Sequence, residues 1–565
     1  MSHIDHIGGH NIMVSFVSAG SPKKAFHAFR PVPMAMAFCF SMLLILSISP
    51  LRAENEFHVS SEFSYTYNDV SGPGKDQSSL TEGFRYHNLS SFYGNGNIKD
   101  IEYNFNVGIK ATDDRSDDIK TFSLTNLQGR AANKIQTLTL GDTFESFSQY
   151  SLNTALKGGS YKYFNQEKNS PELTFVYGYA YPRWDNFHPL YGGADVRAIR
   201  RQVFGGRIKQ NFTPDFYVGI SFAESSDKEN TRVFDTDQIF RNKQYTIDAE
   251  YRPIPGLTLR TELSASLTRE SPQEGAPDKD YAGNAYKFEA IGDGGPSRVA
   301  LEYERVSPKF NTLVGSATSD REKAKGKWRY RHTKNMTYNF GFLWYRDNLH
   351  GNRTAGRTDT FKPDIGVTIS NLFKREYSIL DIAYNYNRQY NAQQSTVDNV
   401  VSLNYKDRFG IFDSDTSLGY SLYNTKRNQR KDEEFLYNTA LSSRHSFDTF
   451  ILRPSLYLGG RTFQDELNSE TDKIYEYSLG VGVDIPACNI TSNIKAGQNY
   501  LEKGGDGDSS SKTFVNLNVY YRPKFLSKLN QGMIFVRVFV NDFGYSTTTR
   551  NFRENSITSG LNIEF

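Results

Sequence analysis

Apolar and polar residues alternate with a period of two through nearly all of the chain after residue 53. Within 101–110 the odd positions are Ile101, Tyr103, Phe105, Val107 and Ile109, and the residues between them are polar or glycine. The same alternation runs through 257–268, 475–484 and the last ten residues. Because successive side chains of a strand point to opposite faces, the pattern predicts an all-β fold whose strands have one apolar and one polar face.

Three features favour a transmembrane barrel over a soluble sandwich, propeller or β-helix. The predicted strands of about ten to thirteen residues have the length that a tilted strand needs to cross a bilayer. Charged residues and glycine lie in the middle of the polar face, which a water-filled lumen accommodates. Aromatic residues make up 14% of the chain and recur near strand ends, as in the girdles at membrane interfaces, with cross-strand packing as the alternative for any one ring.

Long polar connections alternate with short turns along the sequence. The long ones include 69–81, 225–239 and 461–472, and the short ones include Gly94–Asn97, 211–214 (NFTP), 253–256 (PIPG) and 292–295 (GDGG). Outer-membrane barrels alternate in this way, with short periplasmic turns and longer outer loops. We predict a single large antiparallel transmembrane barrel of about 26 strands, within a range of roughly 24–28, with both chain ends in the periplasm.

Residues 23–53 have the pattern of a secretory signal peptide. Basic residues precede an apolar run from Met34 to Ser49, which is too short for a transmembrane helix, although an uncleaved anchor is the alternative. We predict cleavage after Ala53, so that 1–53 is a cleavable signal peptide with an N-terminal extension and 54–565 is the barrel.

Cleavage at that point changes the charge balance of the chain. It removes four basic and one acidic residue from totals of 66 and 63, which leaves 62 of each. Nucleic-acid binding needs a basic surplus, so we expect no nucleic-acid partner.

The chain ends in SITSGLNIEF, with Leu561, Ile563 and the terminal Phe565 on one face. Together with the leader and the repeated amphipathic strands, this end resembles the outer-membrane β-barrels of Gram-negative bacteria, in which it is the signal for membrane insertion. The resemblance covers the whole chain after residue 53 and specifies a class rather than a family. It implies an integral protein of the bacterial outer membrane, with outer-membrane lipids and the barrel-assembly machinery as partners.

Charged residues on the expected inner face have both signs. We expect the following to line the lumen: Glu102, Lys110, Arg252, Arg260, Glu262, Glu476, Asp484 and Arg537. A mixed lumen indicates no strong preference for anions or cations, and pairing between neighbouring strands is the simpler interpretation. A barrel of this size is wide, and three connections with apolar or aromatic residues are candidates to fold into it, with ordered outer loops as the alternative: 142–158, 182–199 and 307–325.

The sequence has no H-E-x-x-H, P-loop or G-x-S-x-G motif, and its histidines lack metal-ligand spacing. We therefore assign no catalytic, metal or cofactor residues and expect that the protein is not an enzyme.

The fold predicts a porin-like channel or an export conduit for solutes, polysaccharide or secreted chains. The alternative is a structural sleeve that holds a partner, such as a lipoprotein, a cytochrome or a surface assembly, and such a partner would also plug the lumen.

Overall fold

The computed structural model describes residues 56–565 except 166–169, 181–182, 185–198, 233–236, 273–276, 351–355, 393–394, 426–429, 527–528 and 530. The described residues belong to one unit, Glu54–Phe565. The predicted signal peptide, 1–53, lies outside the described residues.

Strands account for most of the described residues. They are β1 (Glu56–Ser71), β2 (Gly83–Ile98), β3 (Ile101–Thr112), β4 (Phe122–Ala132), β5 (Gln136–Ser146), β6 (Asn153–Tyr163), β7 (Glu172–Ala180), β8 (Arg201–Thr213), β9 (Phe216–Asp227), β10 (Ile239–Ile254), β11 (Leu257–Ser271), β12 (Lys279–Gly294), β13 (Ser297–Val306), β14 (Arg321–Thr333), β15 (Met336–Asp347), β16 (Asp359–Ser370), β17 (Ile379–Tyr390), β18 (Ser395–Phe409), β19 (Phe412–Thr425), β20 (Arg430–Ser443), β21 (His445–Ser446), β22 (Ile451–Asp465), β23 (Glu470–Ile485), β24 (Ile490–Glu502), β25 (Ser510–Tyr521), β26 (Gln531–Tyr545) and β27 (Phe552–Glu564).

Short 3-10 helices occur in the connections. They are η1 (Lys75–Gln77), η5 (Glu229–Thr231), η6 (Leu372–Lys374), η7 (Pro486–Cys488), η8 (Lys524–Leu526) and η9 (Thr548–Arg550). None of the described helices has the length and apolar character needed to span a bilayer.

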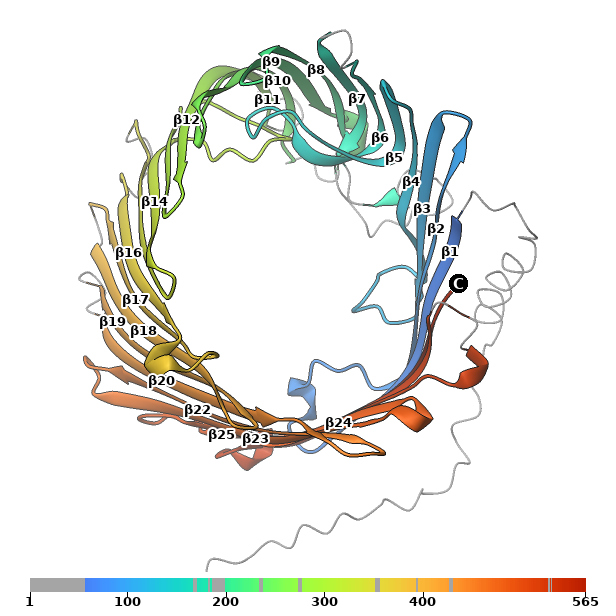
Figure 1. The fold of residues 1–565 in the computed structure, drawn as a ribbon, viewed down its shortest axis with the longest axis vertical. Helices are drawn as coiled ribbons and strands as arrows, with labels where there is room; N and C mark the ends of the chain where they lie inside the picture. Colours follow the sequence, from blue (N-terminus) through green and yellow to red (C-terminus); the bar gives the residue numbers. More distant parts are fainter. Residues whose placement is uncertain are drawn as a thin grey trace, which may run out of the picture. The chain divides into compact units, whose positions relative to one another are not determined.

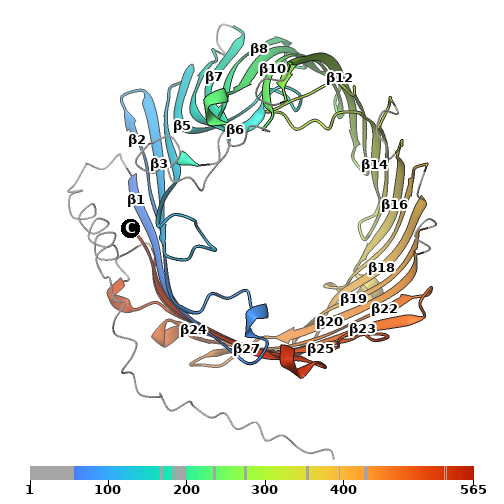
Figure 2. The same ribbon diagram turned by 180° about the vertical axis from the view of Figure 1, so that it is seen from behind.

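The described strands form one antiparallel sheet that closes on itself (Figures 1 and 2). The closing pair is β1 with β27, which runs from Ser60↔Glu564 to Ser71↔Arg553. The two-residue β21 pairs with β22 beyond the end of β20, so it extends β20 rather than adding a strand. The wall is therefore a closed antiparallel barrel of 26 strands, and the predicted fold is confirmed.

The strands extend further than the sequence pattern indicates. β2 continues to Ile98, so the turn predicted at Gly94–Asn97 is wrong, and the chain reverses at Lys99 and Asp100 instead. Lys99 has the left-handed conformation (φ 58°) that this tight reversal requires. The long connection expected at 461–472 is also wrong, because β22 and β23 leave only residues 466–469 between them.

The hydrogen-bonded pairing of β4 with β5 is short, and it runs only from Gln128↔Gly141 to Ala132↔Thr137. Gly141 has φ 95°, and a Cβ there would lie 2.1 Å from the carbonyl oxygen of Leu127. Next to it, the Asp142 carboxylate accepts hydrogen bonds from the Leu127 backbone N–H and the Trp184 indole, each over 2.7 Å. Side-chain bonds therefore hold the wall where main-chain pairing stops.

Phe565 completes the closing pair, since its N–H donates to the Val59 carbonyl over 3.0 Å and the Val59 N–H donates back over 3.4 Å. We predict that deleting Phe565 lowers the amount of inserted barrel, because it removes these bonds and the aromatic end. Immunoblotting of outer-membrane fractions measures the effect, with Phe565→Tyr as the control that keeps an aromatic end. Wild-type amounts of the truncated protein would contradict the prediction.

Leu418 and Ser417 are neighbours near the middle of β19 and point to opposite faces of the wall. Leu418 is opposed to Leu403 and Tyr437, whereas Ser417 is opposed to Asn404 and Asn438. We predict that Leu418→Arg destabilises the barrel by about 2–4 kcal/mol, the cost of an arginine on the lipid face near the midplane. Ser417→Arg should cost much less, because its side chain reaches water.

Unfolding in urea, followed by the loss of heat-modifiable migration in gel electrophoresis, compares the two variants at the same depth. Equal destabilisation by Leu418→Arg and Ser417→Arg would show that the two faces are assigned wrongly.

Candidate functional site in the lumen wall

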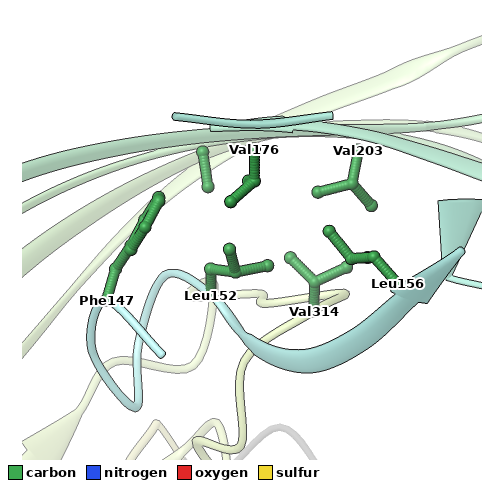
Figure 3. Close-up of a cluster of buried hydrophobic side chains, with 7 residues drawn as sticks. Phe147, Leu152, Leu156, Val176, Val203 and Val314 are labelled. Carbon is green, nitrogen blue, oxygen red and sulfur yellow. The ribbon is translucent and has the colours of Figure 1, made fainter. Parts of the chain in front are cut away.

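Two chain segments that pack on the wall identify its lumen face. Directly opposed residues of neighbouring strands share a face, so Val176, Gly205 and Ala223 lie on the same face of β7–β9. Segments 147–152 and 307–320 pack against that face, inside the ring (Figures 1 and 3). The opposite face exposes large apolar side chains to lipid, among them Phe175, Phe204 and Ile220. Because directly opposed residues share a face, the pairing of each strand with its neighbour assigns a lumen face and a lipid face to every strand of the barrel.

We call 147–152 and 307–320 together the inner layer. Its apolar side chains are buried against wall residues in two clusters: Phe147, Leu152 and Val314 against Leu156, Val176, Val203 and Ala223, and Tyr150 and Phe310 against Ala285 and Val306. Tyr150 is fully buried and meets Phe310 edge-on, with the ring centroids 5.8 Å apart. This apolar content explains why these segments pack on the wall instead of remaining in solvent.

Polar side chains of the lumen face bind the main chain of the inner layer. The Asn311 carbonyl accepts from the side-chain amides of Asn242 and Gln244 over 3.0 and 3.1 Å. The Asn311 N–H donates to the Ser266 hydroxyl over 3.1 Å. A buried main-chain group needs such partners, and here side chains of β10 and β11 supply them.

The two segments of the inner layer are also joined to one another. The Asn153 N–H, at the end of the first segment, donates to the Val314 carbonyl, and the Ser316 N–H donates to the Gln149 carbonyl, each over 2.8 Å. The inner layer is therefore one body of chain lying on β6–β13, rather than two independent loops.

A continuous series of ion pairs crosses the lumen face of β10–β14. Its members alternate in sign: Arg252–Glu250 (2.6 Å), Glu250–Arg260 (2.8 Å), Arg260–Glu289 (3.7 Å), Glu289–Lys287 (2.6 Å), Lys287–Glu302 (3.8 Å), Glu302–Lys323 (2.7 Å) and Lys323–Glu304 (2.7 Å). We call this series the ion-pair band. Because each charge lies beside an opposite one, the band presents little net field to the lumen.

Glu304 joins the ion-pair band to the inner layer. Its carboxylate accepts from the Tyr150 hydroxyl over 2.9 Å and from the Gln149 amide over 2.7 Å, and the residue is only 8% exposed. Burial, together with the negative charge of Glu304, raises the pKa of the Tyr150 phenol above its ordinary value. The phenol therefore stays a protonated donor, and this contact persists through the physiological pH range.

The structure brings three of the expected lumen residues together. Arg252 and Arg260 belong to the ion-pair band. Glu262 lies two residues further along β11, beneath the inner layer, with Ser148 and the Tyr150 backbone close to its carboxylate. Arg252 and Arg260 therefore contribute to the charged surroundings of the inner layer, and Glu262 lies directly beneath it.

The other five expected residues lie on other parts of the lumen face. Lys110 pairs with Asp117 (2.7 Å), Asp484 pairs with Arg453 (2.6 Å), Glu476 accepts from the Tyr457 hydroxyl (3.3 Å), Arg537 lies over the Phe535 ring (4.4 Å), and Glu102 is exposed. The register places them apart from the ion-pair band, and their role in a passage stays a prediction.

Sequence reasoning missed Lys287, Glu289, Glu302, Glu304 and Lys323. They follow the same period of two as Arg260, so the alternation indicated that they lie on the polar face of their strands. Which charges meet depends on the register between strands, and the position of each turn sets that register. The pattern within one strand therefore could not reveal the band.

Two of the three connections expected to fold inward, 142–158 and 307–325, provide the inner layer. Of the third, 182–199, only Arg183, Trp184 and Ile199 are described. Arg183 binds Asp118 over 3.0 Å, and Trp184 binds Asp142 at the β4–β5 join.

The closed wall, its apolar outer face and its polar inner face define an integral outer-membrane β-barrel of the Gram-negative kind. The profile of the family described as S-layer protein SlpA, beta-barrel domain, matches residues 54–348, more than half of the chain. The chain belongs to this family. The match spans β1–β15 and the whole inner layer. No curated protein matches the sequence.

Several solved structures have a similar barrel fold. The P pilus usher (PapC) translocation pore is 10% identical with a TM-score of 0.36, covering 90% of this chain and 99% of its own. The siderophore receptor PirA from Pseudomonas aeruginosa is 10% identical with a TM-score of 0.41, and the alignment covers 91% of this chain and 81% of the receptor. OpdO from Pseudomonas aeruginosa is 13% identical with a TM-score of 0.34, and the alignment covers 65% of this chain and 97% of OpdO. These likenesses concern the fold alone.

We predict that Tyr150→Ala loosens the inner layer at a cost of about 3–5 kcal/mol, the usual loss for a buried aromatic ring. Tyr150→Phe keeps the ring and loses only the bond to Glu304, and should cost about 1–2 kcal/mol. Limited proteolysis, with cleavage mapped by mass spectrometry, should show new cuts within 147–152 and 307–320 in Tyr150→Ala. Tyr177→Ala, which removes a lipid-facing tyrosine, is the control, and equal cleavage in all variants would contradict the prediction.

Proposed function

We propose that the protein is a passive outer-membrane conduit without catalytic activity, whose lumen the inner layer narrows from one side. The observation that supports this proposal is an inner layer that lies on one part of a 26-strand ring. A folded-in segment fixed by buried apolar contacts and hydrogen bonds is a constriction that stays in place while solutes pass.

The width of the ring supports a passage of some size. Strands about 4.8 Å apart and tilted by about 40° give a wall of this strand number a diameter of about 50 Å. One packed layer of chain is about 10 Å thick, so it narrows such a ring without filling it. A conduit for bulky solutes, polysaccharide or secreted chains fits this width better than a filter for small ions.

The ion-pair band supports weak selection by charge in the part of the lumen face that it crosses. The ion-pair band is balanced along its length, and Arg207 and Asp248 beside it also pair, over 2.7 Å. Single-sign rings are what make pores strongly selective, so we expect the narrowed wall to discriminate mainly by size.

The surrounding partners follow from the same proposal. Outer-membrane lipids contact the apolar face, and the barrel-assembly machinery inserts the chain through the end that includes Phe565. The even strand number supports two chain ends on the same side of the membrane, which we assign to the periplasm.

A second candidate function is a structural sleeve for a surface assembly. The family's name concerns an S-layer protein, and a wide lumen or its rim offers room for a partner. In that case the partner would fill the space that the inner layer leaves.

We predict steady single-channel conductance when purified 54–565 is inserted into a planar bilayer. Tyr150→Ala should raise the conductance, because it releases the constriction, whereas Tyr177→Ala on the lipid face should leave it unchanged. Silence from correctly folded protein would overturn the conduit and favour the sleeve, which co-purification of a stoichiometric partner would then support.

A further inference from the structure

The lumen face of β24–β26 differs from the face that bears the ion-pair band. Its cations are Lys495, Lys512 and Arg537, one on each strand. Among the described residues, no carboxylate lies within ion-pair distance of any of the three, whereas the cations of the ion-pair band are all paired. The ion-pair band and the lumen face of β24–β26 therefore present different electrostatic surfaces.

Each of these cations lies beside aromatic rings. The Lys495 ammonium is 5.9 Å from the ring centroids of both Tyr457 and Phe514, so it lies between the two rings. The Lys512 ammonium is 5.3 Å from the centroid of Phe543. Tyr457 and Phe514 are half-buried, so part of each ring remains open to the lumen.

Arg537 is held by a different arrangement. Its guanidinium carbon is 4.4 Å from the centroid of Phe535, which is 1% exposed and therefore serves as a support beneath the charge. Gly560 makes room for the Phe535 ring, because a Cβ there would lie 2.3 Å from a ring carbon. Phe535 is thus a positioning residue, and Arg537 itself is exposed.

Side-chain amides fill the positions between the cations. Asn493 is directly opposed to Asn518, Asn518 to Arg537, and Asn516 to Lys495, so all share the lumen face. Within the described part of the chain, these three asparagine side chains make no hydrogen bond. Their donors and acceptors are available to a ligand that has both kinds of group.

We infer that this amide–cation surface, with Tyr457 and Phe514, binds an acidic polysaccharide segment. Aromatic rings stack on the apolar faces of sugar rings, amides bond with sugar hydroxyls, and the cations pair with carboxylates. Lys495 and Arg537 are two strands apart, about 10 Å, which suits a ligand of more than one sugar unit. The inference specifies the substrate class of the proposed conduit and rests on that proposal.

A nucleic acid fits the same surface less well. Nucleic-acid tracks combine stacked rings with a strongly basic groove, but the region after residue 53 has equal numbers of acidic and basic residues. Glu476 lies beside Tyr457, whose hydroxyl donates to it over 3.3 Å. A carboxylate at that point accepts from a sugar hydroxyl and repels a phosphate.

Binding of alginate oligosaccharide to detergent-purified 54–565, measured by isothermal titration calorimetry, tests the inference. We expect Lys495→Gln and Phe514→Ala each to weaken binding by about tenfold, the effect of losing one charge-assisted or stacking contact. The matched control is Lys362→Gln, another lumen-face lysine, opposed to Leu343 on β15, which should change binding less than about twofold. Arg537→Gln repeats the test if Lys495→Gln fails to fold, as judged by heat-modifiable migration.

Several outcomes would overturn the inference: equal effects of Lys495→Gln and Lys362→Gln, no binding of alginate, or tighter binding of polyphosphate or a single-stranded oligonucleotide. Conductance without alginate binding would refute ligand binding at this surface and would not contradict the proposed conduit. Alginate binding to a barrel that never conducts would refute the conduit instead, because calorimetry needs no open pore.

Discussion

The structure depends on one requirement, which is that every main-chain N–H and C=O group inside a bilayer must find a partner within the protein. The ladder meets it by closing β27 onto β1, so no strand edge faces lipid. Where the ladder shortens, between β4 and β5, the Asp142 carboxylate provides acceptors for neighbouring N–H groups. Closure also fixes the two faces, because neighbouring strands must keep a common register around the ring.

Once the faces are fixed, the polar one is available for other tasks, and the structure uses it in two ways. Along the ion-pair band of β10–β14 the paired charges neutralise one another, and Glu304 holds the inner layer, so these polar side chains contribute to packing. On β24–β26 the cations rest on aromatic rings and have no carboxylate partner among the described residues. The same residue types thus stabilise the structure on one wall and remain available to a ligand on the other.

The period of two predicted the fold closely, because every strand must repeat the same two-faced pattern to stand between lipid and water. The strand count and the class followed from it. The turn before Ile101 was misplaced because Gly94 and Asn97 resemble a turn, while the reversal depends on the left-handed backbone of Lys99. The band was missed because a charge such as Lys323 meets Glu302 only through cross-strand register, which no local pattern contains.

The family match stops at residue 348, just after β15. The matched part contains the inner layer and the ion-pair band, but it cannot close as a barrel in this structure, because β1 pairs with β27 and β15 pairs with β16. Closure requires β16–β27 to supply main-chain partners and an apolar outer face, and it constrains the identity of their lumen-facing side chains less. A specific ligand surface is therefore easier to build on that second wall, because the inner layer, in the part of the chain that the structure describes, rests on β6–β13.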